Sequence, residues 1–297
     1  MTAQARILIV GYLSIDEIET PQGRFSPVPG GAALYAALGA RHASAQAAIC
    51  AHVGDDYPHA WLDALSGLGI DISHVLSRPG PSRTASISYG RGGERRSSHH
   101  AQTSWWRRTE ALAPILPEAL EDIAMIVACP MPLLRLAAVL DTAQRHRIPV
   151  VADTSEAFAA RQGADLLALL PRLAVFAPSQ EETRLILPGL GDDEAAIKLA
   201  SLGADVLHKR GARGAYAVAA FAGSGTRVPT PIGTLVRDPT GAGDSVLGAL
   251  AAHLAAGRPF LDAIVPALLT GSLTVTGIGP SALGLPAAAA EIELRPA

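Results

Sequence analysis

Short apolar runs alternate with longer segments rich in alanine and leucine along most of this chain. A short apolar run is typical of a strand that is buried on both faces, and the longer segments have the spacing of helices. This alternation predicts a mostly parallel sheet with helices on both faces, the α/β class. Ligands of such sheets bind beyond the carboxyl ends of the strands. The expected strands are 6–10, 47–52, 125–128, 150–153, 173–177 and 206–208, and the expected helices are 31–43, 60–68, 133–146, 164–170 and 195–202.

Two polar segments, 14–29 and 82–104, interrupt this alternation. The second contains a strand-like run at Thr84–Tyr89, a glycine turn and a further run over 95–102, which predicts a hairpin with little apolar weight. Two such flaps on one α/β body suggest a lid, although ordinary surface loops have the same pattern. We expect a single domain over 1–297, with a small β lid contributed by the two polar segments.

The composition excludes several classes of function. The chain has 297 residues, of which 49% are hydrophobic and 17% charged, as expected of a soluble globular protein with a large core. Its 24 basic and 27 acidic residues give a net charge of −3, so no electrostatic case exists for nucleic acid or an anionic membrane as a partner. Cys50 and Cys129 lie in apolar stretches, typical of reduced, buried thiols, and they indicate a cytoplasmic location.

The stretch Asp238–Asp244 is a glycine-rich turn, DPTGAGD, that leads into a helix of small apolar residues ending near Ala256. The first turn of a helix has unpaired N–H groups that point the same way, and the helix dipole adds positive charge, so this turn can bind an anion. A carboxylate in an anion site is unfavourable unless it has a task or a cation beside it. Asp244 therefore indicates a base held beside a phosphate. The alternative is an ordinary capping aspartate.

Three further features are expected at the same edge of the sheet. Asp16 follows the first strand, and Gly30-Gly31 opens a helix, where paired glycines let a ligand approach the backbone closely. The turn 209–214, KRGARG, follows a late strand and has the composition of a nucleotide-binding turn. Each feature alone is a weak signal, because glycine turns after strands are common.

Together and in this order, these features resemble the ribokinase-like (PfkB) family of small-molecule kinases over nearly the whole chain. The most specific piece is DPTGAGDS with the small-residue helix after it. The resemblance implies a ribokinase-like three-layer sandwich with a small β lid, and an ATP- and Mg²⁺-dependent transfer of a phosphoryl group to a hydroxyl of a sugar or sugar-like molecule. It implies that Asp244 is the general base. The amides of Gly241, Ala242 and Gly243 would hold the transferring phosphoryl group.

The resemblance also implies roles for residues elsewhere in the chain. The acceptor hydroxyls would be bound by Ser14, Asp16, Gly30, Gly31 and Tyr35. ATP would be bound by Lys209, Gly211, Arg213 and Gly214. Glu182 would contact Mg²⁺, if necessary through water, and Asp238 and Thr240 would contact a monovalent cation such as K⁺.

Some positions depart from the family pattern. Ser179 stands where the family commonly has the asparagine of an Asn-x-x-Glu element, so metal handling is expected to be altered rather than lost. Tyr35 stands where ribokinases have an asparagine that contacts the sugar, and Cys129-Pro130 occupies the place of an acidic sugar contact. These changes argue against ribose itself and favour another sugar, a polyol such as inositol, or a nucleoside.

Other functional classes are weighed against the kinase. A non-catalytic ligand-binding protein on the same fold is the second alternative. No Gly-x-Gly-x-x-Gly follows the first expected strand, which argues against a nicotinamide enzyme. The pair Trp105-Trp106 either covers a ligand, anchors the hairpin to the core or forms a subunit contact. A monomer and a lid-mediated homodimer both fit the sequence.

Overall fold

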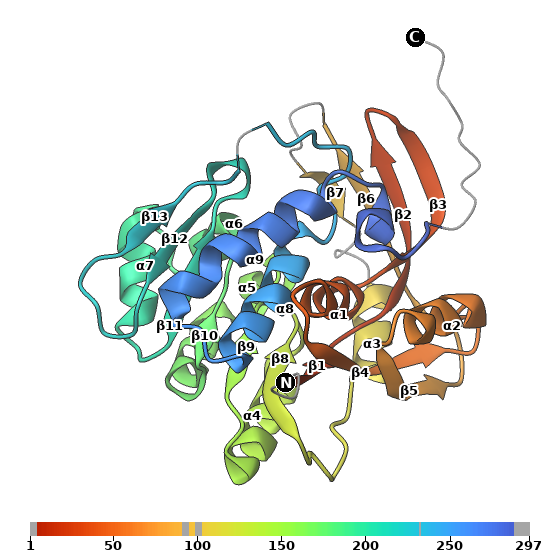
Figure 1. Ribbon diagram of the computed structural model, residues 1–297, viewed down its shortest axis with the longest axis horizontal. Coiled ribbons are helices and arrows are strands. Elements are labelled where there is room, and N and C mark those ends of the chain that lie inside the picture. Colours follow the sequence, from red (N-terminus) through yellow and green to blue (C-terminus); the bar gives the residue numbers. More distant parts are fainter. Residues whose placement is uncertain (1–4, 91–94, 99–102, 232, 288–297) are drawn as a thin grey trace.

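The computed structural model describes residues 5–90, 95–98, 103–231 and 233–287. Its centre is a nine-stranded sheet in the order β13-β12-β11-β10-β9-β8-β1-β4-β5 (Figure 1). From β11 to β5 neighbouring strands are parallel, and β12 and β13 add an antiparallel edge. The strands are β1 (Arg6–Val10), β4 (Gln46–Gly54), β5 (Asp71–Arg78), β8 (Ile123–Ala128), β9 (Val150–Ala152), β10 (Val175–Phe176), β11 (Asp205–Lys209), β12 (Ala215–Val218) and β13 (Thr226–Val228).

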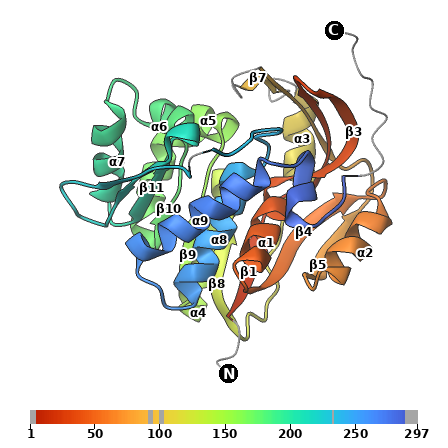
Figure 2. The ribbon, with the colours of Figure 1, turned by 45° about the horizontal axis from the view of Figure 1, so that its top comes forward.

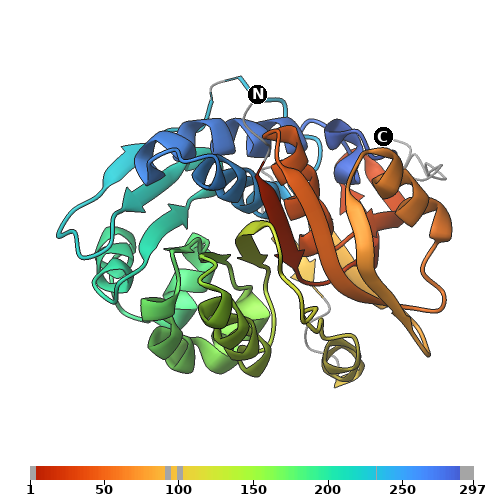
Figure 3. The ribbon, with the colours of Figure 1, turned by 60° about the horizontal axis from the view of Figure 1, so that its bottom comes forward.

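Helices cover both faces of this sheet. Figure 3 shows the blue helices on one side of it and the green helices on the other. Strand β1 shows why two layers form, because side chains alternate between the faces of a strand. Ile7 and Ile9 pack in one apolar cluster with α1, α2, α8 and α9, whereas Leu8 and Val10 pack in a second cluster with α4, α5, α6 and α7. The helices are α1 (Ala32–His42), α2 (His59–Gly67), α3 (Thr103–Ala111), α4 (Leu133–His146), α5 (Glu156–Leu166), α6 (Gln180–Ile186), α7 (Asp192–Ala200), α8 (Ala242–Ala255) and α9 (Phe260–Thr274), with short 3₁₀ turns η1 (Leu167–Arg172), η2 (Gly211–Arg213) and η3 (Gly279–Leu283).

A second, four-stranded sheet lies beside α1 and α3, at the top right of Figure 1 and also visible in Figure 2. Its order is β3-β2-β6-β7, formed by β2 (Ser14–Thr20), β3 (Gly23–Gly30), β6 (Arg83–Tyr89) and β7 (Arg95–Ser98). Strand β2 pairs antiparallel with β3 and parallel with β6. The two polar segments of the sequence therefore meet in one sheet. The glycine turn of the expected hairpin, at 92–93, and its residues 99–102 lie outside the described residues.

The α/β class with helices on both faces is confirmed. One expected helix was misplaced: 164–170 covers only the end of α5, which begins at Glu156 and continues as a 3₁₀ turn through Pro171. Within the described part of the chain, no helix is both long and apolar enough to cross a membrane.

Candidate active site

The turn before α8 is held tightly against α1. Gly241 caps α8 with a left-handed backbone (φ 73°), and a Cβ added there would lie 2.1 Å from the ring of Tyr35. Below this point the two helices touch through glycines. A Cβ on Gly39 would lie 2.2 Å from the carbonyl oxygen of Ser245, and one on Gly248 would lie 1.8 Å from that of Ala36. The small residues after the DPTGAGD motif thus allow close helix packing, which fixes the first turn of α8.

Asp244 lies in the first turn of α8 and is half-buried. Burial and the nearby charge of Asp153 raise the pKa of its carboxyl group to about 6, although Lys209 and Arg95 lower it. Among the predicted anion-binding amides, that of Ala242 donates to the carbonyl of Pro239 at 3.3 Å, a long hydrogen bond. The amides of Gly241 and Gly243 are therefore the better donors for an anion.

A buried ion pair lies beside this turn. Lys209, at the end of β11, binds the carboxylate of Asp153, which directly follows β9. A Cβ on Gly243 would lie 3.2 Å from the Lys209 ammonium nitrogen, so this charge touches the first turn of α8. Burial opposes the charge on Lys209, but Asp153 and Glu182 outweigh this effect and raise its pKa. The side chain of Lys209, predicted to bind nucleotide, therefore lies among the carboxylates around Asp244.

The Ser179 element retains its helix-start geometry. The amide of Ser179 donates to the Glu182 carboxylate at 2.6 Å, and the Ser179 hydroxyl accepts from the Glu182 amide at 3.3 Å, a capping box at the start of α6. Burial and the charge of Asp153 raise the pKa of Glu182 to about 8. Within the described ranges no group of three His, Cys, Asp or Glu side chains is placed to hold a metal ion.

Asp16 lies on the buried face of β2 and is 3% exposed. A Cβ on Gly30 would lie 1.9 Å from its Oδ2 atom, so only glycine leaves room for this carboxylate. Its Oδ1 atom is buried without a hydrogen-bond partner. Burial raises the pKa of Asp16 to about 6, and the Ser14 hydroxyl, Arg83 and Arg95 partly oppose this effect. Ser14 is itself 4% exposed and lies opposite Gly30 in the strand pairing.

Gly31 and Tyr35, both predicted to bind the acceptor, pack against backbone segments of the protein. Gly31 caps α1 with φ 97°, and a Cβ there would lie 2.3 Å from the carbonyl oxygen of Tyr12. Tyr35 is 1% exposed beneath the Gly241 turn, and its buried hydroxyl has no hydrogen-bond partner. Its ring supports the turn at Gly241 instead of lining an open surface.

Asp238 ties the turn to a neighbouring loop. One carboxylate oxygen accepts from the amide of Thr240 at 2.9 Å and the other from the amide of Gly279 at 2.7 Å. The Thr240 hydroxyl donates to the Tyr89 hydroxyl at 3.2 Å, which connects the second sheet to this turn. The carboxylate of Asp238 thus already has two backbone donors.

The predicted nucleotide turn joins β11 to β12. Gly214 has φ 82°, and a Cβ there would lie 2.0 Å from the carbonyl oxygen of Val228. The side chain of Arg213 binds Gln180, at the start of α6. Gly211 has open space around the position of a Cβ. Gly214 therefore shapes the hairpin, whereas Gly211, Ala212 and Arg213 are exposed.

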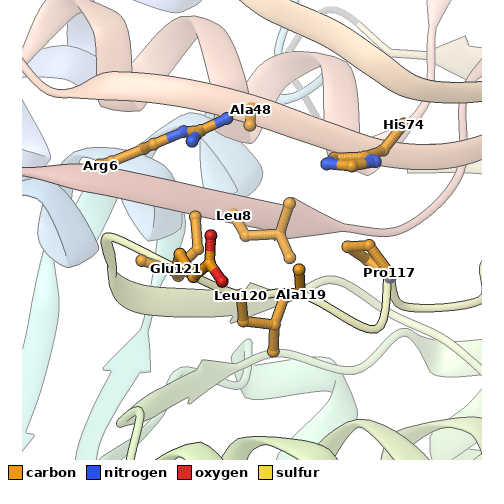
Figure 4. A pocket seen from close by; sticks show the side chains of 9 residues that line it. Arg6, Leu8, Ala48, His74, Pro117, Ala119, Leu120 and Glu121 are labelled. Atoms are coloured by element: carbon orange, nitrogen blue, oxygen red, sulfur yellow. The ribbon is translucent and has the colours of Figure 1, made fainter.

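A small cavity elsewhere is not a candidate for the site. It has a volume of about 30 Å³ and lies among Arg6, Leu8, His74, Leu120 and neighbouring residues (Figure 4). Arg6 begins β1 and Ile123 begins β8, so this cavity lies at the amino ends of the strands, away from Asp244 and Asp153. It has room for water only.

Sequence reasoning missed Asp153, Tyr89 and Arg83. Asp153 had a usable signal, because a carboxylate closes the buried apolar run 150–153. Tyr89 and Arg83 stand at the two ends of one strand-like run, and nothing in their local pattern distinguishes them from other residues of that run.

Comparisons with known proteins agree with this geometry. Residues 4–288 match the pfkB family carbohydrate kinase family. The chain is 29% identical over 264 residues to a protein called cytidine kinase from Thermococcus kodakarensis, covering 87% of this chain and 91% of that protein. A nucleoside kinase from Burkholderia thailandensis in complex with inosine superposes with a TM-score of 0.74 at 22% identity, covering 92% of both chains. A putative ribokinase II from E. coli in complex with ATP and Mg²⁺ superposes with a TM-score of 0.73 at 20% identity, covering 94% of both chains.

The family match spans nearly all of the chain, and the structural neighbours share its three-layer fold. The glycine-rich turn, the carboxylate in it and the second sheet are thus parts of a fold used for phosphoryl transfer to small molecules. This chain belongs to the pfkB family of carbohydrate kinases and is a small-molecule kinase whose phosphoryl acceptor is a hydroxyl group.

Proposed function

We propose that this kinase transfers the γ-phosphoryl group of Mg·ATP to a hydroxyl of a nucleoside, with Asp244 as the general base. The observation that carries this proposal is the position of Asp244 in the first turn of α8, half-buried beside Gly243 and Lys209. The names of the relatives, a cytidine kinase and a nucleoside kinase with inosine bound, support a nucleoside as acceptor. Other sugars and polyols such as inositol are the alternative acceptors.

The residues around Asp244 suit this reaction. A pKa of about 6 leaves the Asp244 carboxylate ionised at neutral pH and still basic enough to accept the proton of an attacking hydroxyl. The amides of Gly241 and Gly243, at the positive end of α8, stabilise negative charge on the transferring phosphoryl group. Lys209 keeps Asp244 ionised, and Asp153 holds the Lys209 side chain in place. Positioning and charge stabilisation are what phosphoryl transfer mainly requires.

The acceptor lies against Asp16 in this proposal. The Oδ1 atom of Asp16 is buried and lacks a donor, and an acceptor hydroxyl supplies one. Ser14 and the Gly30-Gly31 backbone complete this side of the site. The nucleotide lies against the turn at Gly211, where the surroundings are open.

The donor set fits a magnesium ion that arrives with the nucleotide. Mg²⁺ usually keeps several waters and binds one or two carboxylates together with substrate phosphates. Glu182 and Asp153 are the carboxylates near Lys209 that would hold it through water, and no three-ligand protein site is present in the described residues. When bound, Mg²⁺ neutralises charge on the phosphates. A monovalent cation at Asp238 and Thr240 stays a prediction, which turnover in K⁺ compared with Na⁺ buffers tests.

The test is an ADP-release assay with Mg·ATP over cytidine, uridine, inosine, adenosine, ribose and myo-inositol. We expect turnover with at least one nucleoside and at least tenfold lower kcat/KM with ribose and inositol. Faster turnover of a free sugar or of inositol would assign the acceptor to that class. No turnover with any compound, while calorimetry still shows binding, would favour a non-catalytic protein on this fold.

A further inference from the structure

An aromatic cluster lies between the second sheet and the large sheet. Trp105 and Trp106 of α3 pack edge to face, with ring centroids 4.8 Å apart. Phe158 of α5 lies 6.0 Å from Trp105 and 5.5 Å from Trp106. Tyr12, which follows β1, donates its hydroxyl to the carbonyl of Thr109 in α3 at 3.0 Å. These contacts join α3, α5 and the segment after β1, which lie far apart in the sequence, in one aromatic cluster.

The guanidinium of Arg83 packs against this aromatic cluster. The guanidinium carbon lies 4.2 Å from the ring centroid of Tyr12 and 4.8 Å from that of Trp105. Contacts of this kind hold the flat faces of a guanidinium, so its hydrogen-bond donors remain available only at its edge. Its Nε atom is buried and has no hydrogen-bond partner. A buried donor without an acceptor is rare in folded proteins and calls for an explanation.

Arg83 faces the same space as Asp16. In the parallel pairing of β2 with β6, Ser14 lies beside Arg83 and Asp16 beside Ala85, so Asp16 and Arg83 share one face of the sheet. Burial dominates the pKa of both groups, raising that of Asp16 and lowering that of Arg83, and in each case the opposite charge of the other group opposes it. The Oδ1 atom of Asp16 and the Nε atom of Arg83 nevertheless both lack a partner. One hydrogen-bond acceptor (Asp16 Oδ1) and one donor (Arg83 Nε) without partners therefore lie on the same face of the second sheet.

We propose that Arg83 is a specificity residue that donates a hydrogen bond to a carbonyl oxygen of the nucleobase, while Asp16 accepts from the hydroxyls of the same nucleoside. This inference rests on the proposed function and names the part of the acceptor that it left open. A neutral carbonyl fits better than a carboxylate or phosphate, because an anion here would be repelled by the buried carboxylate of Asp16. A free sugar or inositol offers hydroxyls to Asp16 but no such carbonyl to Arg83.

Substrate pairs test the proposal in the unmodified enzyme. Inosine carries a ring carbonyl at C6 and the proton on N1 that goes with it, and purine riboside lacks both but is otherwise the same. We expect a KM for purine riboside roughly 10- to 100-fold above that for inosine, the range for one hydrogen bond to a charged group. Equal KM values would overturn the proposal, and so would stronger competitive inhibition by ribonate, an acidic sugar, than by inosine.

The variant Arg83→Met tests the residue itself. Its KM for inosine and cytidine should rise roughly 10- to 100-fold, whereas its KM for purine riboside and for ATP should change less than about threefold. Arg161→Met is the matched control: Arg161 lies over the Trp106 ring at 3.7 Å in the same cluster but is exposed, and its KM values should stay unchanged. An equal rise in the KM for inosine and for purine riboside in Arg83→Met would show that Arg83 has a structural role only.

Failure of the proposed function is distinguishable from failure of this inference. If the unmodified enzyme neither binds nor phosphorylates any nucleoside, both are wrong. If it phosphorylates nucleosides but does not discriminate by the ring carbonyl, only the role of Arg83 is wrong. If Arg83→Met does not fold, the comparison of inosine with purine riboside decides alone.

Discussion

The first turn of α8 and the inner face of the second sheet treat their buried polar groups differently. Around α8, Lys209 pairs with Asp153, Glu182 accepts from the Ser179 amide, and Asp238 accepts from two backbone amides. On the second sheet, the Oδ1 atom of Asp16 and the Nε atom of Arg83 have no partner. In the proposed site, the charged groups of the reaction side therefore find their partners within the protein, although the Tyr35 hydroxyl beneath the turn has none, whereas the acceptor side is complete only when a ligand supplies the missing groups.

The largest expected effect is at the complete side. Asp244→Asn removes the base and keeps the shape of the turn, so kcat should fall by roughly 10²- to 10⁴-fold while the Kd of ATP changes less than about threefold. Steady-state kinetics and calorimetry measure the two quantities. A kcat within tenfold of the unmodified enzyme would show that Asp244 is a capping residue only.

The second effect is at the incomplete side. Asp16→Ala removes the unpaired carboxylate, so the KM of the acceptor should rise roughly 100-fold with little change in the Kd of ATP, because hydrogen bonds to a charged group contribute about 1.5–3 kcal/mol. A larger effect on ATP than on the acceptor would place Asp16 outside the acceptor site.

The pH dependence separates the two sides. Asp244 must be ionised to accept a proton, so kcat should fall about tenfold per pH unit below the pKa of about 6 and be flat above pH 7. Asp16 has a pKa of about 6 as well and acts on binding, so it contributes to the acid limb of kcat/KM only. In Asp16→Asn the kcat profile should keep its acid limb. Loss of that limb would assign it to Asp16.

The cost of leaving Asp16 without a partner should appear in stability. Its pKa is raised from 3.8 to about 6 on folding, so its contribution to stability is fully present below pH 3.8 and is lost as the pH rises through about 6. Asp16→Asn, which stays neutral, should therefore be more stable than the unmodified chain at pH 8 by up to about 3 kcal/mol, and by much less at pH 4. Urea unfolding at the two pH values measures this. An equal gain at both would contradict the electrostatic cause.

The smallest effect concerns the contact between the two sides. Tyr89→Phe removes the hydroxyl that meets Thr240 at 3.2 Å and should cost about 0.5–1.5 kcal/mol of unfolding free energy, with less than a tenfold change in kcat. Tyr57→Phe is the matched control, because the buried Tyr57 hydroxyl has no hydrogen-bond partner and its removal should cost nothing. An equal loss of unfolding free energy in both variants would mean that the hydrogen bond between Tyr89 and Thr240 does not stabilise the fold.

The large sheet was predictable because its central strands are short, apolar and buried on both faces. The strand 6–10 and the helix 133–146 appear with the expected limits. Strand β5 was missed because it is an edge strand in which polar residues outnumber apolar ones, and α9 was missed although it is apolar, since Pro266 stands inside it. Edge strands and helices with an internal proline carry weak local signals.

The sequence predicts the candidate site most directly where a local motif defines it. Asp244 and Gly241 belong to one motif, which the structure places at the start of α8. Asp153 and Arg83 acquire their surroundings from strands and helices far away in the sequence, so no spacing rule brings them to Lys209 or Trp105. Glu182, whose role at Mg²⁺ stays a prediction, also shows that a motif residue can use one carboxylate oxygen for a helix cap.

Helix α1 connects the proposed acceptor site to the turn before α8. Gly31, at its start, borders the proposed acceptor side, and Tyr35, one helical turn later, supports the turn at Gly241, which is proposed to bind phosphate. Since a helical turn has a fixed length and the Tyr35–Gly241 contact has no room for an added atom, the backbone would fix the spacing between the two reactants of the proposed reaction. Side chains on β2 and β6 can therefore change, and the choice of acceptor with them, while the distance over which the phosphoryl group moves stays the same.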